Sequence, residues 1–192
     1  MRKSVFIFLI LAFGIVMLYG SVFAKDIMPE GWSKWVQDGN DSAYEIGVDT
    51  KIFRSEPKSY YIKSVTPVSI ESSAQVVQAI QSDDYRGKRI RLSVFLRGEN
   101  IKDRGWIYLQ ASTSKPIRGG ADHCLVGDSP NWINCKIVMD VPQNSKNISY
   151  GINLKGGGQI WFDDLSIGVV GKDVPETWLY LREEATKPSN LP

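Results

Sequence analysis

Short strand-like segments recur along almost the whole chain and are separated by turn sequences. In several of them apolar and polar residues alternate, which is the period of a strand with one buried face. Clusters of Gly, Pro, Asn and Asp lie between them, such as Gly156-Gly157-Gly158, and no long helical pattern interrupts the series. The candidate strands are 32–36, 44–48, 60–65, 74–80, 89–96, 106–111, 124–126, 133–138, 148–154 and 160–170. The pattern predicts an all-β fold, an antiparallel sandwich or barrel.

The last candidate strand changes the phase of its alternation in the middle. Ile160 and Phe162 share one parity, whereas Leu165, Ile167 and Val169 share the other. A regular strand cannot bury both sets on one side, so we expect a β-bulge at Asp163 and Asp164. The bulge would bring two adjacent carboxylates to the rim of a sheet, where Asp163 and Asp164 are candidate ligands of a cation such as calcium, or acceptors of backbone N–H groups.

The first 24 residues have the pattern of a secretory signal peptide. Arg2 and Lys3 precede an apolar stretch, and Val22 and Ala24 are small residues at the positions that a signal peptidase recognises. We expect cleavage after Ala24 and a secreted or periplasmic protein. The apolar stretch is also long enough to anchor the chain in a membrane if it stays uncleaved. Residues 25–171 would then form one β-sandwich domain and residues 172–192 a C-terminal tail.

The charge balance argues against a nucleic-acid partner. The chain has 23 basic and 21 acidic residues, and loss of the leader removes two basic residues and no acidic one. The mature chain is therefore neutral, whereas nucleic-acid binders usually have a basic excess or a basic face.

The two cysteines fit an oxidising compartment. Cys124 and Cys135 lie at equal distances from the turn-like Ser129-Pro130, a placement that suits a cross-strand disulfide. The alternative is a catalytic Cys–His pair, because His123 precedes Cys124. Neighbouring residues on a strand point to opposite faces, which favours the disulfide.

Aromatic and amide side chains share the face opposite to the expected core. The core set consists of Ile90, Leu92, Val94, Leu96, Ile107, Leu109, Ala111, Ile148, Tyr150, Ile152 and Leu154. The opposite parity places Phe95, Trp106, Tyr108, Gln110 and Asn153 on an outer face. A sugar ring stacks its apolar C–H face on an aromatic ring and offers its hydroxyls to amides, so these five residues are the candidate glycan-binding residues. The alternative is that Trp106 and Tyr108 lie under a covering loop or the tail and fill a second small core.

Several segments carry a resemblance to a known fold family. They are YRGKRIRLS at 85–93, Trp132, DVP at 140–142, ISYGI at 148–152 and GQIWFDDL at 158–165. In this order they resemble a bacterial galactose-binding-like jelly roll, the β-sandwich of carbohydrate-binding modules, over about residues 31–170. Related domains occur alone in exported proteins or appended to regulators and hydrolases.

The resemblance implies a structural calcium in many sugar-binding members. The ion is held by an Asp of the closing strand, which Asp163 or Asp164 matches, and by groups of an N-terminal segment of the Asn-x-x-Phe-Glu type. Residues 27–32 offer only Glu30 for the second part. Calcium, which takes six to eight oxygen ligands, therefore lacks half of its expected ligand set.

The motifs favour binding over catalysis. The chain has one His, and it shows no Ser-His-Asp, zinc or phosphate motif and no opposed pair of carboxylates. We expect a non-catalytic exported module that binds a polysaccharide or other glycan. The alternative is a protein–protein interaction or structural module of the cell envelope, using Trp178 and Leu181 of the tail. The tail itself has the pattern of a short helix capped by Asp173 with Pro175 at its first position.

Overall fold

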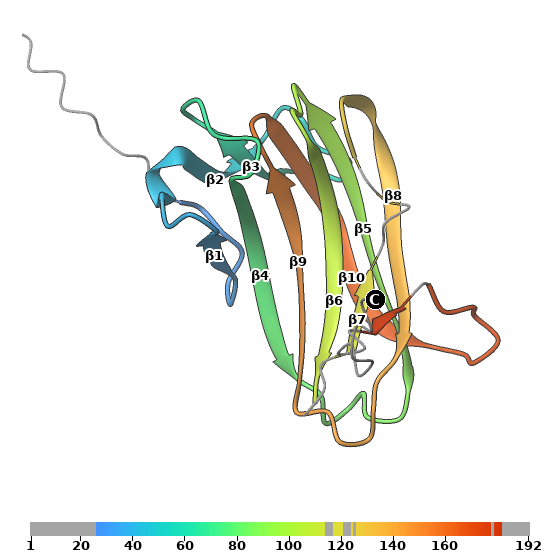
Figure 1. Ribbon diagram of the computed structural model, residues 1–192. Coiled ribbons are helices and arrows are strands. Elements are labelled where there is room, and N and C mark those ends of the chain that lie inside the picture. The colour runs from blue at the N-terminus through green and yellow to red at the C-terminus, as the bar shows by residue number, and fades with distance from the viewer. Residues whose placement is uncertain (1–25, 114–116, 121–123, 125, 178, 182–192) are drawn as a thin grey trace, which may run out of the picture.

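Two antiparallel sheets pack face to face and form a sandwich (Figure 1). The computed structural model describes residues 26–113, 117–120, 124, 126–177 and 179–181. The predicted leader therefore lies outside the described residues. Within the described part of the chain, no helix has the length and apolar character needed to cross a membrane.

Sheet A has six strands and sheet B has five. The order in sheet A is β1 (Ser33–Val36), β4 (Ser73–Gln81), β9 (Asn147–Lys155), β6 (Arg104–Ser112), β7 (Ile117–Gly120) and β11 (Leu179–Leu181). The order in sheet B is β2 (Tyr44–Asp49), β3 (Ser59–Ser64), β10 (Gln159–Val170), β5 (Arg89–Glu99) and β8 (Ser129–Asp140). A 3-10 turn, η1 (Asp41–Ala43), precedes β2. All strand pairs are antiparallel, so the predicted all-β sandwich is confirmed.

The core lies between the two sheets and contains the residues that period-2 alternation assigned to it. Each apolar residue of the predicted inward sets of β5, β6 and β9 is at most 4% exposed. Because the inward parity of these strands supplies the core, the side chains of the other parity form the outer faces of the sandwich. Burial of one parity thus determines which side chains are available to a ligand.

The closing strand β10 contains the predicted bulge. Its register with β5 shifts between Asp163 and Ser166, and Asp164 has a positive φ of 49°. Ile160 and Phe162 are buried before the shift, at 0% and 2% exposure. Leu165 and Ile167 pack against the core after it, as expected. Val169 does not, since it is 53% exposed beyond the edge of the core.

The tail is extended where a helix was predicted. Thr177 exchanges backbone and side-chain hydrogen bonds with Val138 of β8. Leu179–Leu181 then pairs with β7 as the edge strand β11 of sheet A. Arg89 fixes the start of this crossing by donating to the carbonyls of Lys172 and Val174, at 3.0 and 2.7 Å. The helix prediction is wrong because backbone pairing with β8 and β7 takes the donors and acceptors that a helix would use internally.

Candidate functional site

Four of the five predicted ligand-binding residues lie on the outer face of sheet A. Trp106, Tyr108 and Gln110 alternate along β6, and Asn153 of β9 is the register partner of Trp106. Phe95 is not among them, because β5 belongs to sheet B. The prediction that all five share one face is therefore wrong for Phe95.

The register of sheet A adds two residues that the sequence reading missed. Asn153 pairs with Gln75 of β4, and Gln75 pairs with Trp35 of β1. One row across the strands therefore reads Trp35, Gln75, Asn153 and Trp106. Three interstrand spacings of about 4.8 Å separate the two tryptophans by about 14 Å. We call the face formed by Trp35, Gln75, Asn153, Trp106, Tyr108 and Gln110 the aromatic face.

The two ends of this row differ in exposure. Trp35 is 49% exposed, which makes it one of the few large apolar side chains that the described part of the chain leaves to solvent. Trp106 is half-buried. The row thus has an exposed ring at one end and a more firmly held ring at the other, with two amides between them.

A glycine makes room for the tyrosine of the next row. Gly151 is the register partner of Tyr108. A Cβ at Gly151 would clash with the carbonyl oxygen of Val76 on β4 and would lie 2.8 Å from Cε1 of the Tyr108 ring. The ring therefore lies against the backbone of β9, and any larger residue at position 151 would displace both the ring and the neighbouring backbone of β4.

Asn153 is the most buried polar residue of the aromatic face. It is 7% exposed, and its Nδ2 has no hydrogen-bond partner among the described residues. A buried amide donor without a partner costs free energy, since it loses its hydrogen bonds to water. The position therefore offers an unused donor to an acceptor of a bound molecule.

Charges at the end of the aromatic face are neutralised. Lys155 lies 2.9 Å from Glu71 and 3.3 Å from Asp103, and hydrogen bonding to Glu71 in particular raises the pKa of Lys155. Arg104 also contacts Asp103 and lies 5.6 Å from the centroid of the Trp106 ring. Because Lys155 and Arg104 both have an acidic neighbour, this end of the face favours an uncharged polar ligand.

On sheet B, Phe95 is covered by Arg54 of the loop between β2 and β3. The guanidinium of Arg54 lies 3.6 Å from the centroid of the Phe95 ring, in cation–π geometry. The same guanidinium forms an ion pair with Asp164. One stacking face of the Phe95 ring is therefore already used within the protein.

Asp163 and Asp164 fix the loop that carries Arg54. Oδ2 of Asp163 accepts the backbone N–H groups of Arg54 and Ser55, at 2.7 and 2.9 Å. Asp164 accepts hydrogen bonds from the side chains of the same two residues. With a guanidinium and these donors on the carboxylates, the pair does not fit a calcium site. Within the described ranges, no group of three or more His, Cys, Asp or Glu side chains could hold a metal ion.

The predicted disulfide joins Cys124 and Cys135. Their Cα atoms are 5.5 Å apart, and both residues are buried, at 5% and 0% exposure. The bond attaches the segment before β8 to β8 itself, next to the bridge between Gly105 and Val126. His123, the other half of the alternative catalytic pair, lies outside the described residues.

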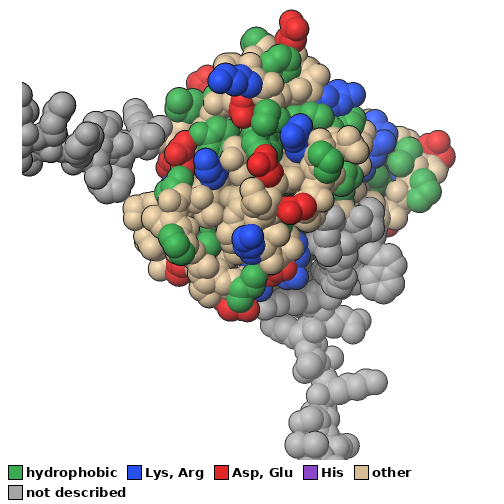
Figure 2. All heavy atoms as spheres, turned by 90° about the horizontal axis from the view of Figure 1, so that it is seen from above, with side chains coloured by type: hydrophobic (Ala, Val, Ile, Leu, Met, Phe, Trp, Pro, Cys, Tyr) green, Lys and Arg blue, Asp and Glu red, His purple; other side chains and the backbone are tan. Residues whose placement is uncertain are grey.

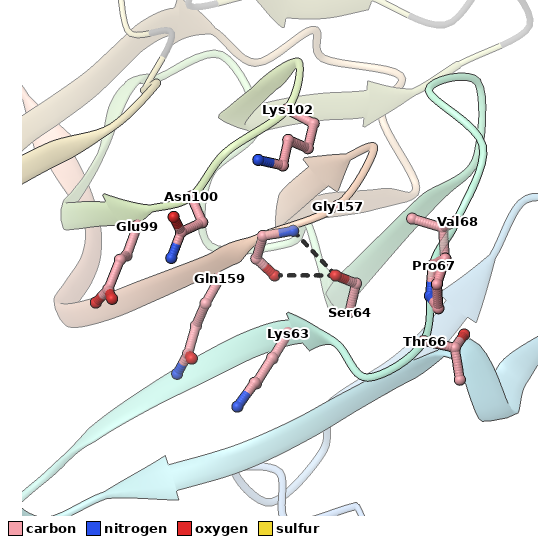
Figure 3. A pocket seen from close by; sticks show the side chains of 11 residues that line it. Lys63, Ser64, Thr66, Pro67, Val68, Glu99, Asn100, Lys102, Gly157 and Gln159 are labelled. Carbon is pink, nitrogen blue, oxygen red and sulfur yellow. Dashed lines mark hydrogen bonds between the residues drawn. The ribbon is translucent and has the colours of Figure 1, made fainter.

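Open cavities lie among the loops at one end of the sandwich, and two of them are lined by residues that the structure describes. Basic, acidic and apolar side chains are interspersed over this end, which Figure 2 shows from above. The larger cavity has a volume of about 530 Å³ and lies between the β3–β4, β5–β6 and β9–β10 loops (Figure 3). Lys63, Asn100, Lys102 and Gln159 line it, and Oγ of Ser64 accepts the N–H of Gly158 at 2.9 Å. The smaller cavity, of about 240 Å³, lies beside Arg97.

Known proteins resemble the chain in sequence and in fold. It is 32% identical over 178 residues to a protein described as an uncharacterized HTH-type transcriptional regulator, YbfP, of Bacillus subtilis (strain 168). The match covers 87% of this chain and 58% of the regulator, so the chain spans less than two thirds of that relative. No protein-family model matches the chain.

Two solved structures show the fold. One is the C-terminal family 22 carbohydrate-binding module of Clostridium thermocellum Xyn10B, with a TM-score of 0.54 and 14% identity over 76% of this chain and 89% of the module. The other is the enzymatically active domain of tailspike protein 4 of bacteriophage CBA120, with a TM-score of 0.56 and 13% identity over 73% of this chain and 20% of the tailspike chain. The chain therefore has the jelly-roll β-sandwich fold of carbohydrate-binding modules, as the resemblance implied.

Proposed function

We propose that this chain, which shares the β-sandwich fold of carbohydrate-binding modules, is a non-catalytic module that binds a glycan on its aromatic face. The observation that carries the proposal is the row Trp35, Gln75, Asn153 and Trp106. It combines two rings with a buried amide donor that has no partner among the described residues.

The row supplies both interactions that a sugar needs. The apolar C–H face of a pyranose stacks on an indole ring, and its hydroxyl oxygens accept from amide N–H groups. Trp35 and Trp106 offer rings about three strand spacings apart, which suits a short stretch of polysaccharide lying across the strands. Gln75 and Asn153 lie beneath its centre, where a hydroxyl or ring oxygen would satisfy Nδ2 of Asn153.

The composition of the face supports binding without hydrolysis. The outward-facing residues of the described strands of sheet A include no Asp or Glu. Most glycosidases require two carboxylates flanking the scissile bond. The proposed ligand would therefore be held on the aromatic face and released unchanged.

The compartment is part of the proposal. A buried disulfide between Cys124 and Cys135 persists best outside the cytosol. Together with the signal-peptide pattern of residues 1–24, it supports a secreted or periplasmic module. The relative in Bacillus subtilis is described as a regulator. We propose that the region shared with it is a ligand-binding region in both proteins.

The alternative is a protein–protein interaction module without a sugar ligand. Its predicted contact residues were Trp178, which lies outside the described residues, and Leu181, which belongs to the edge strand β11. An interaction through the tail would leave Asn153 and the two tryptophans of the row without a role. The aromatic face therefore favours the glycan.

A glycan array identifies the ligand class, and NMR locates it. We expect the purified protein to bind one class of uncharged polysaccharide on the array. Titration with the matching oligosaccharide should shift the indole N–H signals of Trp35 and Trp106. The indole of Trp161 is an internal control, because it donates to Asp49 at 2.9 Å on sheet B. Absence of array binding, or equal shifts at Trp161, would count against the proposal.

A further inference from the structure

Arg97 lies on the outer face of sheet B, where none of the described carboxylates forms an ion pair with it. Its guanidinium carbon lies 5.5 Å from the centroid of the Trp161 ring, which is its register partner on β10. Its Nε is buried and has no hydrogen-bond partner within the described part of the chain. No ion pair or hydrogen bond joins the Arg97 side chain to any described residue. A guanidinium that has lost part of its hydration is stabilised by pairing with an anion.

An irregularity in β8 opens the sheet beside this arginine. Leu96 pairs with Ile133 and Gly98 pairs with Ser129, so that residues 130–132 lie opposite Arg97 alone. The extra residues interrupt the β5–β8 ladder at this point, an irregularity of the kind that often lies beside binding sites. The cavity of about 240 Å³ lies here, lined by Arg97, Asn100, Ser129 and Pro130 among others.

The acidic residues of this cavity do not neutralise Arg97. Asp128 uses Oδ1 to accept the N–H of Ile101 at 2.6 Å. Glu99 lies at the exposed rim, and neither carboxylate is within ion-pair distance of the guanidinium. Among the residues that the structure describes, nothing therefore occupies the N–H donors of the Arg97 guanidinium, while Asn100 and Ser129 add an amide and a hydroxyl to the same cavity.

We propose that this cavity binds the carboxylate of an acidic saccharide, a uronic acid residue, through the guanidinium of Arg97. A planar carboxylate matches the two parallel N–H donors of a guanidinium, which a neutral sugar cannot do. Asn100 and Ser129 line the same cavity, and Oγ of Ser129, which donates to the carbonyl of Asn131, keeps its acceptor capacity for a sugar hydroxyl. The larger cavity shares Glu99 and Asn100 with this one and adds Lys63 and Lys102 (Figure 3). These two lysines would bind the carboxylate of a second acidic sugar next to the first, at the same end of the sandwich. This site is separate from the aromatic face and does not depend on the function proposed for it.

The test compares acidic and neutral forms of the same sugar. Isothermal titration of the full chain with sodium D-galacturonate and sodium D-glucuronate is compared with D-galactose and D-glucose at matched ionic strength. We expect at least one uronate to bind and its neutral counterpart to bind at least about tenfold more weakly, as for loss of a charge-assisted pair. Sodium acetate and sodium sulfate in the same titration distinguish a sugar site from a simple anion site, and either salt binding as tightly as the uronate would overturn the saccharide assignment.

Variants of Arg97 connect the binding to this cavity. Arg97→Gln should lose uronate binding by about tenfold or more, and Arg97→Lys should retain only part of it because a lysine has no fork. Arg91→Gln is the matched control, since Arg91 is exposed on the same face of the same strand. Trp106→Ala should leave uronate binding unchanged, which separates this site from the aromatic face. No uronate binding by the wild type, or unchanged binding by a folded Arg97→Gln, would overturn the proposal.

Discussion

Trp106 lies directly opposite Asn153 across β6 and β9, so that an aromatic ring borders a buried amide whose Nδ2 has no partner among the described residues. Cores avoid unpaired donors, and surfaces usually solvate them. An unpaired donor at 7% exposure beside a stacking ring is instead the arrangement that a hydrogen-bonding ligand would complete. This relationship connects the fold to the proposed activity.

Replacing Asn153 separates binding from stability. Asn153→Leu should abolish glycan binding while leaving the free energy of unfolding unchanged or raising it by about 1 kcal/mol, because the variant removes a buried unsatisfied donor. Urea unfolding and titration calorimetry measure the two effects. Asn147→Leu is the control, being exposed on the same face of the same strand. A large loss of stability in Asn153→Leu would mean that the amide has a structural role.

Asp163 should stabilise the protein through hydrogen bonds and not through a metal. Asp163→Asn weakens the acceptor of two backbone N–H groups and should cost about 1 to 2 kcal/mol. Asp164→Asn removes an ion pair with Arg54, whose side chain is 42% exposed, and should cost less than about 1 kcal/mol. Thermal melting in calcium and in chelator should give the same Tm for the wild type. A chelator-dependent Tm that disappears in either variant would instead support the cation site.

The attachment of the tail should depend on acid pH through Asp140. The hydrogen bond from Arg89 lowers the pKa of Asp140 to about 2. Since the folded-state pKa lies below the unfolded value of about 4, the stabilisation is complete above about pH 4 and disappears as the pH falls toward 2. The Tm difference between wild type and Asp140→Asn should therefore be positive near neutral pH and vanish near pH 2. A difference that is the same at both pH values would show that Arg89 does not stabilise the ionised form.

The disulfide should be formed in the exported protein and should contribute substantially to stability. The two cysteines are 11 residues apart in sequence, and closure of a loop of that length contributes about 3 kcal/mol. The Cys124→Ala/Cys135→Ala double variant should lose that amount in urea unfolding and should no longer respond to reducing agent. Mass spectrometry that found two free thiols in native material would rule out the bond.

Local alternation predicted the faces of individual strands but not their partners. The inward sets of β5, β6 and β9 followed from period 2, and the bulge of β10 followed from the phase change between Phe162 and Leu165. Parity says which side of a strand a residue occupies, and it does not say which sheet the strand joins. Phe95 was therefore grouped with Trp106 although the two residues lie on opposite sheets.

The place of Trp35 and Gln75 on the aromatic face depends on long-range strand pairing. Trp35 has the parity opposite to the buried Val36, which is a local signal that it faces outward. Its alignment with Asn153 and Trp106 requires the order β1-β4-β9-β6, which brings together segments far apart in the chain. The helix prediction for the tail is wrong for a related reason. Pairing with β7 and β8 outweighs the local helix signals at Asp173 and Pro175.

The central claim is that sheet A carries the glycan site, and the affinity of matched aromatic variants tests it most directly. Titration calorimetry with the oligosaccharide found on the array should give a loss of about tenfold or more for Trp106→Ala and for Trp35→Ala, because each removes a stacking ring. Phe95→Ala, which removes a ring from sheet B, should bind as the wild type does. Retained affinity in both folded tryptophan variants, or a loss confined to Phe95→Ala, would contradict the account.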